Sequence, residues 1–330
     1  MKIGKMGILR KDYFLNRWVF YASGRKKRPM EFKQDNVQYS SLKTCLFCPT
    51  NEHLTPREIG RVEEKGSWKI RWFPNKFPAV QLKGSPKLGK KRNFLLEGNT
   101  YGSHEVIVET RHHNKQLADL SVEHIKEVLE VCFIRIKALS KAKGSQYVTV
   151  FKNHGPSGGT SLVHSHMQVA SLPILPSEII EKATAIKKLG KCPYCSIISL
   201  EAKSKRKIIE TKNAVAFAPF ASRFNYEAWI FPKRHIAGIE LNDKELYDIA
   251  LILKKLLLKL KKMNASYNFF FQYAPKGNKE SNKEANKNNK FHFHIEVTPR
   301  IAKWAGFEFS TGAVINSVMP EDAVKFYRSG

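Results

Sequence analysis

The first half of the chain alternates apolar and polar residues in a way that predicts strands around one helix. Residues 104–109 and 147–151 are short and rich in β-branched and aromatic side chains, as strands are. Between them, a segment that begins near Ser121, a good N-cap residue, has apolar side chains at helical spacing. Its apolar positions are Ile125, Val128, Leu129, Cys132, Phe133 and Ile136. A strand that contains the His-x-His sequence 164–166 closes this unit.

The second half repeats the same order. Residues 226–231 and 267–272 predict strands, and a helix begins at Asn242, where Glu245 three residues later forms a capping box. Its apolar positions are Leu246, Ile249, Ile252 and Leu256. A second His-x-His sequence, 292–294, closes this unit. We therefore expect an α+β fold of two similar repeats, with antiparallel sheets and packed helices.

Each repeat also carries two cysteines and two histidines in the same order. The first set is Cys45, Cys48, His113 and His164, and the second set is Cys192, Cys195, His235 and His292. Paired C-x-x-C sequences in a cytosolic chain favour metal sites over disulfides. Two cysteines and two histidines suit tetrahedral zinc. The sequence therefore predicts a duplicated, zinc-stabilised unit with two structural zinc ions per chain.

Composition narrows the class of protein. The chain has 330 residues with 42% apolar content, enough for two domains or one fused double domain. No apolar run reaches the roughly 18 residues of a membrane span, and the first ten residues lack the apolar core of a signal peptide. We expect a cytoplasmic protein without a membrane partner.

The net charge of +28 suggests nucleic acid as a partner. Much of this charge is scattered lysine on predicted helices and loops, and residues 276–290 form a polar segment that predicts a mobile loop. No nucleic-acid-binding module is recognisable. A zinc-containing nucleic-acid-binding protein is the alternative from another class, and a metal-stabilised protein without activity is a third.

The loop before the first His-x-His sequence has the composition of a phosphate site. It contains Gly155, Gly158 and Gly159, which allow backbone N–H groups to approach a ligand, and Thr160 and Ser161, which add hydroxyl groups. These groups suit the oxygens of a diphosphate.

Two side chains after this loop predict covalent catalysis. His166 can attack phosphorus through a neutral imidazole nitrogen, which divides one difficult displacement into two easier ones. Residues alternate along a strand, so His164, His166 and Gln168 are expected on one face. Gln168 can then contact the phosphoryl oxygens during the transfer.

The stretch 153–168 resembles the active-site motif of galactose-1-phosphate uridylyltransferases and their relatives in the histidine-triad superfamily. Similar pieces at 16–19, 25–29, 73–78 and 305–308 extend the resemblance over nearly the whole chain. It implies two fused histidine-triad-like repeats in one chain.

The resemblance also implies roles for individual residues. His166 corresponds to the nucleophile, Gln168 and Ser161 to residues that contact the phosphate, and Asn153 to an active-site asparagine. The first Cys2His2 set corresponds to a closed structural zinc site. Gly158, Gly159 and Thr160 correspond to the part of this motif that forms the phosphate-binding loop.

Substrate-binding residues follow from the resemblance in the same way. Arg25 and Arg28 match arginines that hold sugar-phosphate groups, and Phe73, Asn75 and Phe77 match the nucleoside pocket. The family is a homodimer whose site is completed by the partner subunit, so Phe307 and Glu308 are expected to face the hexose across an interface.

Other features resemble the ADP-glucose phosphorylase branch of this family. Cys192 and Cys195 stand where common bacterial uridylyltransferases bind their second metal with a carboxylate and histidines. Lys76 replaces an aspartate of the bacterial pattern, and the run 306–312 also favours this branch.

The second His-x-His sequence differs from the first at one decisive position. His294 corresponds to His166, but Glu296 replaces the glutamine, and a carboxylate repels phosphate. We therefore divide the chain into residues 1–173, a catalytic repeat, and residues 174–330, a structural repeat that completes the substrate site. The proline-containing stretch 172–176 marks this division.

The predicted activity is nucleotidyl transfer by a ping-pong mechanism. A nucleoside monophosphate moves from a nucleotide sugar, as in UDP-glucose, to His166 and then to a hexose 1-phosphate. An ADP-sugar or dinucleoside polyphosphate phosphorylase with inorganic phosphate as acceptor is the alternative with the same mechanism.

Overall fold

The computed structural model describes residues 7–22, 24, 41–42, 44–275 and 289–329. Its strands are β1 (Ile8–Lys11), β2 (Trp18–Tyr21), β3 (Gly60–Glu64), β4 (Ser67–Pro74), β5 (Gly89–Arg92), β6 (Leu95–Glu97), β7 (His104–Val108), β8 (Tyr147–His154), β9 (His166–Leu172), β10 (Lys207–Glu210), β11 (Ala214–Phe217), β12 (Ala228–Pro232), β13 (Tyr267–Gln272), β14 (His294–Pro299) and β15 (Val314–Asn316). Its α-helices are α1 (Val122–Leu139), α2 (Ser177–Lys187), α3 (Pro193–Glu201), α4 (Asp243–Lys262), α6 (Gly306–Thr311) and α7 (Pro320–Arg328).

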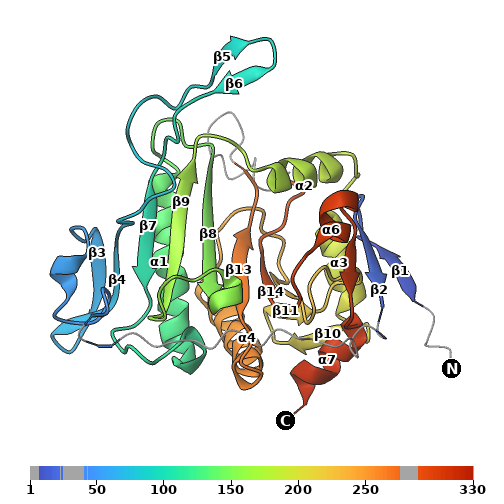
Figure 1. Cartoon of the computed structure of the whole chain (residues 1–330). Helices are drawn as coiled ribbons and strands as arrows, with labels where there is room; N and C mark the ends of the chain where they lie inside the picture. Colours follow the sequence, from blue (N-terminus) through green and yellow to red (C-terminus); the bar gives the residue numbers. More distant parts are fainter. Residues whose placement is uncertain (1–6, 23, 25–40, 43, 276–288, 330) are drawn as a thin grey trace.

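One ten-stranded antiparallel sheet runs through both repeats (Figure 1), in the order β10-β11-β12-β14-β13-β8-β9-β7-β4-β3. The predicted pair of sheets is thus joined by hydrogen bonds between β8 and β13, where Asn153 lies opposite Asn268 and Phe151 opposite Phe270. Strands β1, β2 and β15 form a smaller sheet, and the hairpin β5–β6 stands clear of the body.

Helices α1 and α4 pack against each other and against one face of the large sheet. The predicted caps are confirmed: Ser121 accepts a hydrogen bond from the His124 N–H, and Asn242 and Glu245 form a reciprocal capping box. The apolar side of each helix enters a continuous core with the helix-facing side chains of the strands. Burial of each large apolar side chain contributes about 1.5–3 kcal/mol to the stability of the fold. The face covered by α1 and α4 therefore holds the sheet in place.

The opposite face of the sheet is covered differently in the two repeats. In the second repeat, the fully buried Tyr194 of α3 lies against His294, with ring centroids 4.9 Å apart. In the first repeat, Phe151 and Gln168 on this face are only half-buried. The first repeat therefore keeps an accessible surface where the second repeat has a packed interior.

Some predicted strand limits differ from the structure. Both His-x-His strands begin at the second histidine, His166 or His294, so strand alternation does not place His164 on the face of His166. Strand β12 begins at Ala228 because Tyr226 has a φ of +61°, which an extended strand does not allow. The predicted division at 173/174 falls between β9 and α2, and it stays a prediction.

None of the helices in the described part of the chain has the length and apolar character needed to cross a membrane. Residues 276–288 lie outside the described residues, so the mobile loop predicted there is not tested.

Candidate functional site

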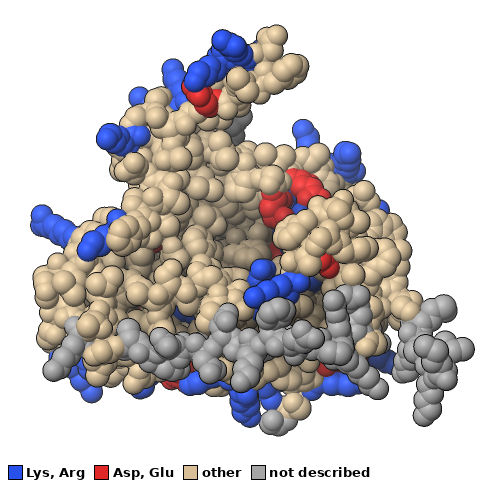
Figure 2. Space-filling model, viewed as in Figure 1, with Lys and Arg blue, Asp and Glu red and all other residues tan. Residues whose placement is uncertain are grey.

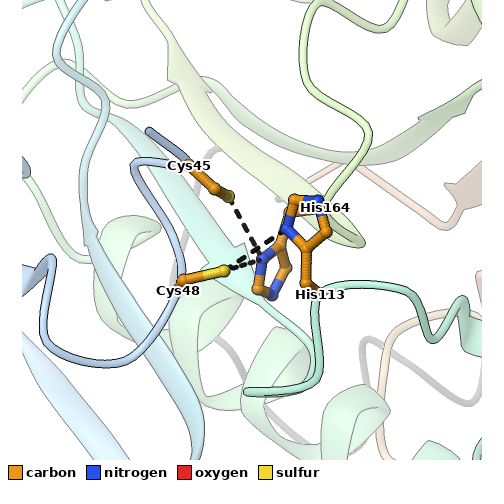
Figure 3. A group of neighbouring side chains, drawn as sticks. All are labelled: Cys45, Cys48, His113 and His164. Atoms are coloured by element: carbon orange, nitrogen blue, oxygen red, sulfur yellow. Dashed lines mark hydrogen bonds between the residues drawn. The ribbon is translucent and has the colours of Figure 1, made fainter. Parts of the chain in front are cut away.

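The four predicted metal ligands of the first repeat converge in the structure, as Figure 3 shows. The Cys45 Sγ lies 3.4 Å from the His164 Nδ1, and the Cys48 Sγ lies 3.3 Å from the His113 Nδ1 and 3.7 Å from the His164 Nδ1. All four side chains are buried. Their backbone positions lie on separate segments, so this cluster ties the segment at 45–48 to the sheet.

The second cluster has the same construction. The Cys195 Sγ lies 3.4 Å from the His235 Nδ1 and 3.6 Å from the His292 Nδ1, and Cys192 completes the set. Cys195 and His235 are only half-buried. This second cluster is therefore closer to solvent than the first.

Both clusters fit a tetrahedral metal ion. Zinc bound at about 2.3 Å by sulfur and about 2.0 Å by nitrogen holds those ligand atoms about 3.6 Å apart, which agrees with the observed distances. The Nε2 atoms of His164 and His292 face the backbone oxygens of Thr110 and Pro232, at 2.7 and 3.0 Å. These bonds fix the rings with Nδ1 toward the cysteines.

The predicted nucleophile His166 has a fixed ring orientation. Its Nδ1 lies 2.9 Å from the backbone oxygen of His164 and therefore donates to it. The Nε2 atom is then the one with a free electron pair. Burial lowers the pKa of the His166 imidazole to about 4, so the ring is neutral near pH 7. The ring of Phe47 packs against it in an edge-on arrangement, with centroids 5.3 Å apart.

Gln168 follows His166 on the same face of β9 and contacts a histidine that the sequence analysis missed. Its Oε1 lies 2.9 Å from the Nε2 of His104, the first residue of β7. The Nδ1 of His104 accepts a hydrogen bond from the Ala79 N–H at 3.1 Å. His104 thus links Gln168 to the backbone near the predicted nucleoside pocket.

The N–H groups of the glycine loop form hydrogen bonds within the loop itself. The N–H groups of Gly158 and Gly159 donate within the short 3₁₀ turn Pro156–Gly158 and its cap, to the backbone oxygens of Gly155 and Pro156. In this conformation they are not free for a ligand, because the turn itself needs them. The Thr160 hydroxyl likewise donates to the Leu162 oxygen at 3.0 Å.

The loop still requires glycine at defined positions. A Cβ on Gly158 would lie 2.8 Å from the Tyr267 backbone oxygen, and Gly159 has a φ of +79°. Ser161 is exposed at the end of the loop. The loop therefore seats tightly on β13 of the second repeat and leaves the Ser161 hydroxyl accessible.

Asn153 is held by an asparagine of the second repeat, which the sequence analysis also missed. The Asn268 Nδ2 lies 2.9 Å from the Asn153 Oδ1 and 2.7 Å from the Gly158 backbone oxygen. Neither Asn268 nor His104 has a local sequence signal, because their partners are set by strand pairing.

A buried ion pair lies beneath the His-x-His segment. The Lys152 Nζ is 2.8 Å from Glu109 and also donates to the Ser165 Oγ at 3.0 Å and to the His166 backbone oxygen at 3.2 Å. Both charged side chains are almost fully buried. This network anchors the backbone that carries His166.

The equivalent position of the second repeat is closed. His294 and Glu296 are fully buried, and the His294 Nε2 lies 3.3 Å from the Glu296 carboxylate. Lys182 of α2 forms an ion pair with the same carboxylate. The Lys182 ammonium group therefore occupies the position beside the Glu296 carboxylate.

The remaining predicted substrate residues lie in different environments. Phe73 is buried against Phe47, with ring centroids 5.7 Å apart, so it forms part of a wall rather than an open surface. Phe77 is 80% exposed. The Asn75 Oδ1 accepts a hydrogen bond from the Phe77 N–H at 2.9 Å. Arg25 and Arg28 lie outside the described residues.

The C-terminal pair lies at α6. Phe307 is 39% exposed and packs edge-on against Phe20. The Glu308 carboxylate accepts hydrogen bonds from the N–H groups of Ala305 and Ile315, at 2.9 and 3.2 Å. Within this chain, Glu308 therefore caps α6 and ties it to β15.

The face of the molecule in Figure 2 is hollowed over the middle of the large sheet. Lysine and arginine side chains lie at several separate places on this face, and one group of them lies beside the hollow.

A mirrored sheet with one His-x-His segment in each half, and with a Cys2His2 cluster beside each segment, defines a double histidine-triad protein. The family description "Galactose-1-phosphate uridyl transferase, N-terminal domain" matches residues 7–176. The chain belongs to this family of nucleotidyltransferases.

Relatives extend the match over nearly the whole chain. An ADP-glucose phosphorylase of Arabidopsis thaliana is 33% identical over 97% of this chain and 92% of its own length. A galactose-1-phosphate uridylyltransferase of Thermotoga maritima is 30% identical over 97% of each chain. The crystal structure of an ADP-glucose phosphorylase from Arabidopsis thaliana with bound ADP-glucose superposes with a TM-score of 0.83, at 30% identity, and covers 98% of this chain and 99% of that one. These matches confirm the fold predicted from the two repeats.

Proposed function

We propose that this protein transfers a nucleoside monophosphate from a nucleotide sugar to a phosphate acceptor through a covalent bond to His166. The observation that carries the proposal is the geometry of His166. Its Nδ1–H is engaged with the His164 oxygen, so Nε2 presents a free electron pair on the sheet face that also carries Gln168. A neutral, oriented imidazole is the form that attacks phosphorus.

The proposed reaction has two displacements. In the first, the His166 Nε2 forms a bond to the α-phosphorus while the bond from that phosphorus to the sugar 1-phosphate oxygen breaks, and the sugar 1-phosphate leaves with the electron pair. In the second, an oxygen of the acceptor phosphate forms a bond to the same phosphorus and the N–P bond breaks.

Gln168 and Ser161 contact the phosphoryl oxygens, and Asn153 lies beside them. Phe73, Asn75 and Phe77 bound the nucleoside, and the Gly158–Gly159–Thr160 turn shapes the phosphate region.

The first candidate reaction uses UDP-glucose as donor and a hexose 1-phosphate as acceptor. Its support is the family match and the similarity to the Thermotoga maritima uridylyltransferase. This reaction would place the protein in galactose and related carbohydrate metabolism.

A second candidate reaction uses an ADP-sugar or a dinucleoside polyphosphate, with inorganic phosphate as acceptor. The Arabidopsis thaliana relative is named an ADP-glucose phosphorylase, and its crystal structure holds ADP-glucose. Both candidates share the His166 intermediate, so they differ in the base and the acceptor and not in the chemistry at phosphorus.

The two Cys2His2 clusters would each hold one structural zinc ion. Four protein ligands fill a tetrahedral site and leave no position for a substrate, so the zinc would fix the chain and take no part in the transfer. In the first cluster, His164 is two residues from His166, and the metal would therefore hold the backbone whose oxygen orients the nucleophile.

The second repeat is proposed to be structural. The covered His294 and the ion pair of Lys182 with Glu296 support this role. We also propose a homodimer in which Phe307 and Glu308 approach the partner's substrate, and in which Arg25 and Arg28 hold the sugar phosphates. The cytoplasmic location expected from the sequence stays a prediction.

Intact-protein mass spectrometry after brief incubation with UDP-glucose or ADP-glucose tests the proposal. We expect an increase equal to one uridylyl or one adenylyl group, which names the base. The increase should be absent in a His166→Ala variant and retained in a His53→Ala variant, whose histidine is exposed and outside the site. A His166→Ala variant that still turns over nucleotide sugar would overturn the covalent mechanism.

A further inference from the structure

The amide groups of Gln168 and Asn153 each have an orientation that backbone atoms determine. An amide oxygen and nitrogen are hard to tell apart by shape, so their assignment depends on the hydrogen-bond network. In both cases the network ends at a backbone group, whose role as donor or acceptor is fixed. The backbone group therefore fixes which amide atom faces each partner.

The first network begins at the Ala79 N–H, which can only donate. It points to the His104 Nδ1 at 3.1 Å, so this nitrogen carries no proton and Nε2 must carry one. Burial lowers the pKa of the His104 imidazole, which agrees with a neutral ring. The His104 Nε2–H then donates to Gln168, 2.9 Å away, so the contacting Gln168 atom must be oxygen.

The second network begins at the Gly158 backbone oxygen, which can only accept. The Asn268 atom at 2.7 Å must therefore be its amide nitrogen. The same nitrogen donates to Asn153 at 2.9 Å, so the contacting Asn153 atom must be oxygen. The first network starts from a backbone N–H donor and the second from a backbone oxygen acceptor. In both networks the amide oxygen of the active-site residue faces the protein.

A backbone group also fixes the orientation of the Asn75 amide. Its Oδ1 accepts from the Phe77 N–H at 2.9 Å, so its nitrogen faces His104. That nitrogen lies 3.4 Å from the His104 Nε2–H. Both atoms are donors, so this contact is not a hydrogen bond.

We propose that His104 and Asn268 are positioning residues that turn the Gln168 and Asn153 oxygens away from substrate, so that both amides present N–H donors to a phosphoryl group. Among the described residues, neither amide nitrogen has a protein partner. A phosphoryl group carries negative charge on its oxygens, and N–H donors stabilise it where oxygens repel it. The proposal rests on the nucleotidyl transfer proposed above.

The arrangement also gives the second repeat a direct part in the active site. Asn268 belongs to β13 and reaches Asn153 across the β8–β13 pairing. Strands β8 and β9 are antiparallel and pair Phe151 with Gln168. Asn153, two residues after Phe151, therefore lies near His166, two residues before Gln168. The second repeat thus orients a side chain beside the nucleophile.

The test is the single-turnover rate at which nucleotide sugar labels the protein. His104→Leu and Asn268→Ala should each lower this rate about 10- to 100-fold, with a smaller change in the substrate concentration for half-maximal rate. His104→Gln, which keeps a donor near the Nε2 position, should restore most of it. A matched loss of an exposed histidine, His53→Leu, should leave the rate unchanged.

Double variants separate positioning from general damage. In a Gln168→Ala background, His104→Leu should have little further effect, and in an Asn153→Ala background Asn268→Ala should have little further effect. Fully multiplied losses would overturn the proposal, because the residues would then act independently of the amides.

Gln168→Glu gives a measurement that does not depend on the folding of the His104 variant. It keeps an oxygen toward His104 but replaces the outward N–H₂ by an oxygen, so labelling should fall at least as far as in Gln168→Ala. A Gln168→Glu variant with the wild-type rate would overturn the assigned orientation. If the wild-type protein is labelled but the His104 and Asn268 variants keep its rate, only this inference fails. If the wild-type protein neither binds nor is labelled by UDP-glucose or ADP-glucose, the proposed function fails with it.

Discussion

Replacing Glu109 by glutamine tests the buried network beneath His166. The change keeps the shape of the side chain but leaves the Lys152 ammonium without its counter-charge. Lys152 is 1% exposed and donates to both Glu109 oxygens, at 2.9 and 2.8 Å. Loss of one partner of a buried pair costs about 3–5 kcal/mol, because the remaining charge stays buried.

The size of the thermal shift follows from the length of the chain. At about 2.1 cal/mol/K per residue, 330 residues unfold with an entropy of about 0.7 kcal/mol/K. A loss of 3–5 kcal/mol should therefore lower Tm by about 4–7 °C in zinc-saturated protein, measured by calorimetry at pH 7. Replacing both partners, as Glu109→Gln with Lys152→Met, should recover much of this loss.

The effect should also depend on pH in a defined direction. Burial lowers the pKa of the Lys152 ammonium, and the Glu109 carboxylate raises it, so the pKa of Lys152 is lower still in the variant. At a pH above the pKa of Lys152 in the folded variant, this side chain is neutral in the folded state. In the unfolded chain the Lys152 amine keeps its proton up to about pH 10.4. Stability of the variant then rises with pH, by at most about 1.4 kcal/mol per unit. The difference in Tm from wild type should shrink between pH 7 and pH 9.5.

A matched exposed pair provides the control. Lys91 and Glu97 form an ion pair in which each side chain is 64% exposed. Glu97→Gln should change stability by less than about 1 kcal/mol. A Glu109→Gln variant as stable as Glu97→Gln at pH 7, or a destabilisation that does not vary with pH, would refute the account of a buried, uncompensated charge.

Three further predictions concern the loop, the metal clusters and a helix cap. Gly158→Ala should lower stability by about 1–3 kcal/mol, since its Cβ would lie 2.8 Å from the Tyr267 oxygen; calorimetry checks this, and an unchanged Tm would contradict it. A chromogenic chelator should remove zinc from the half-buried Cys195 cluster before it removes zinc from the buried Cys48 cluster. Cys195→Ser should therefore abolish the fast phase of zinc release, and Cys48→Ser should leave that phase unchanged. Loss of the fast phase in Cys48→Ser instead would refute this order. Asn242→Ala removes the acceptor for the Glu245 N–H and should cost about 1 kcal/mol in calorimetry, whereas a gain in stability would refute the cap.

Local sequence signals predicted what depends on neighbouring residues. The capping box at Asn242 and the apolar spacing of α1 and α4 correspond to the observed helices. The two Cys2His2 sets were predicted from repeated order, and the structure brings each set together. The C-x-x-C pairs and the repeated order of the ligands can be recognised in a single sequence, although the ligands themselves are far apart in it: Cys48 and His113 are separated by 65 residues.

The features that local patterns do not show depend on contacts between distant segments or on loop conformation. The continuous sheet requires β8 to pair with β13, and no local pattern encodes that choice of partner. His104 is 64 residues from Gln168, so only the register of β7 with β9 shows that they meet. The hydrogen bonds that the Gly158 and Gly159 N–H groups form within the 3₁₀ turn depend on loop conformation, which the sequence does not show.

The β8–β13 pairing suggests how such a chain could have arisen. Read outward from this pair, the strands β8, β9, β7, β4 and β3 mirror β13, β14, β12, β11 and β10. A lone repeat would leave the edge of β8 unpaired, and such an edge recruits another strand. Two identical copies could satisfy it about a two-fold axis, which is the symmetry that the fused chain still shows. Within one chain the two halves can differ: the first keeps an open surface, and the second buries the equivalent surface under α2 and α3. Two identical copies related by a two-fold axis could not differ in this way.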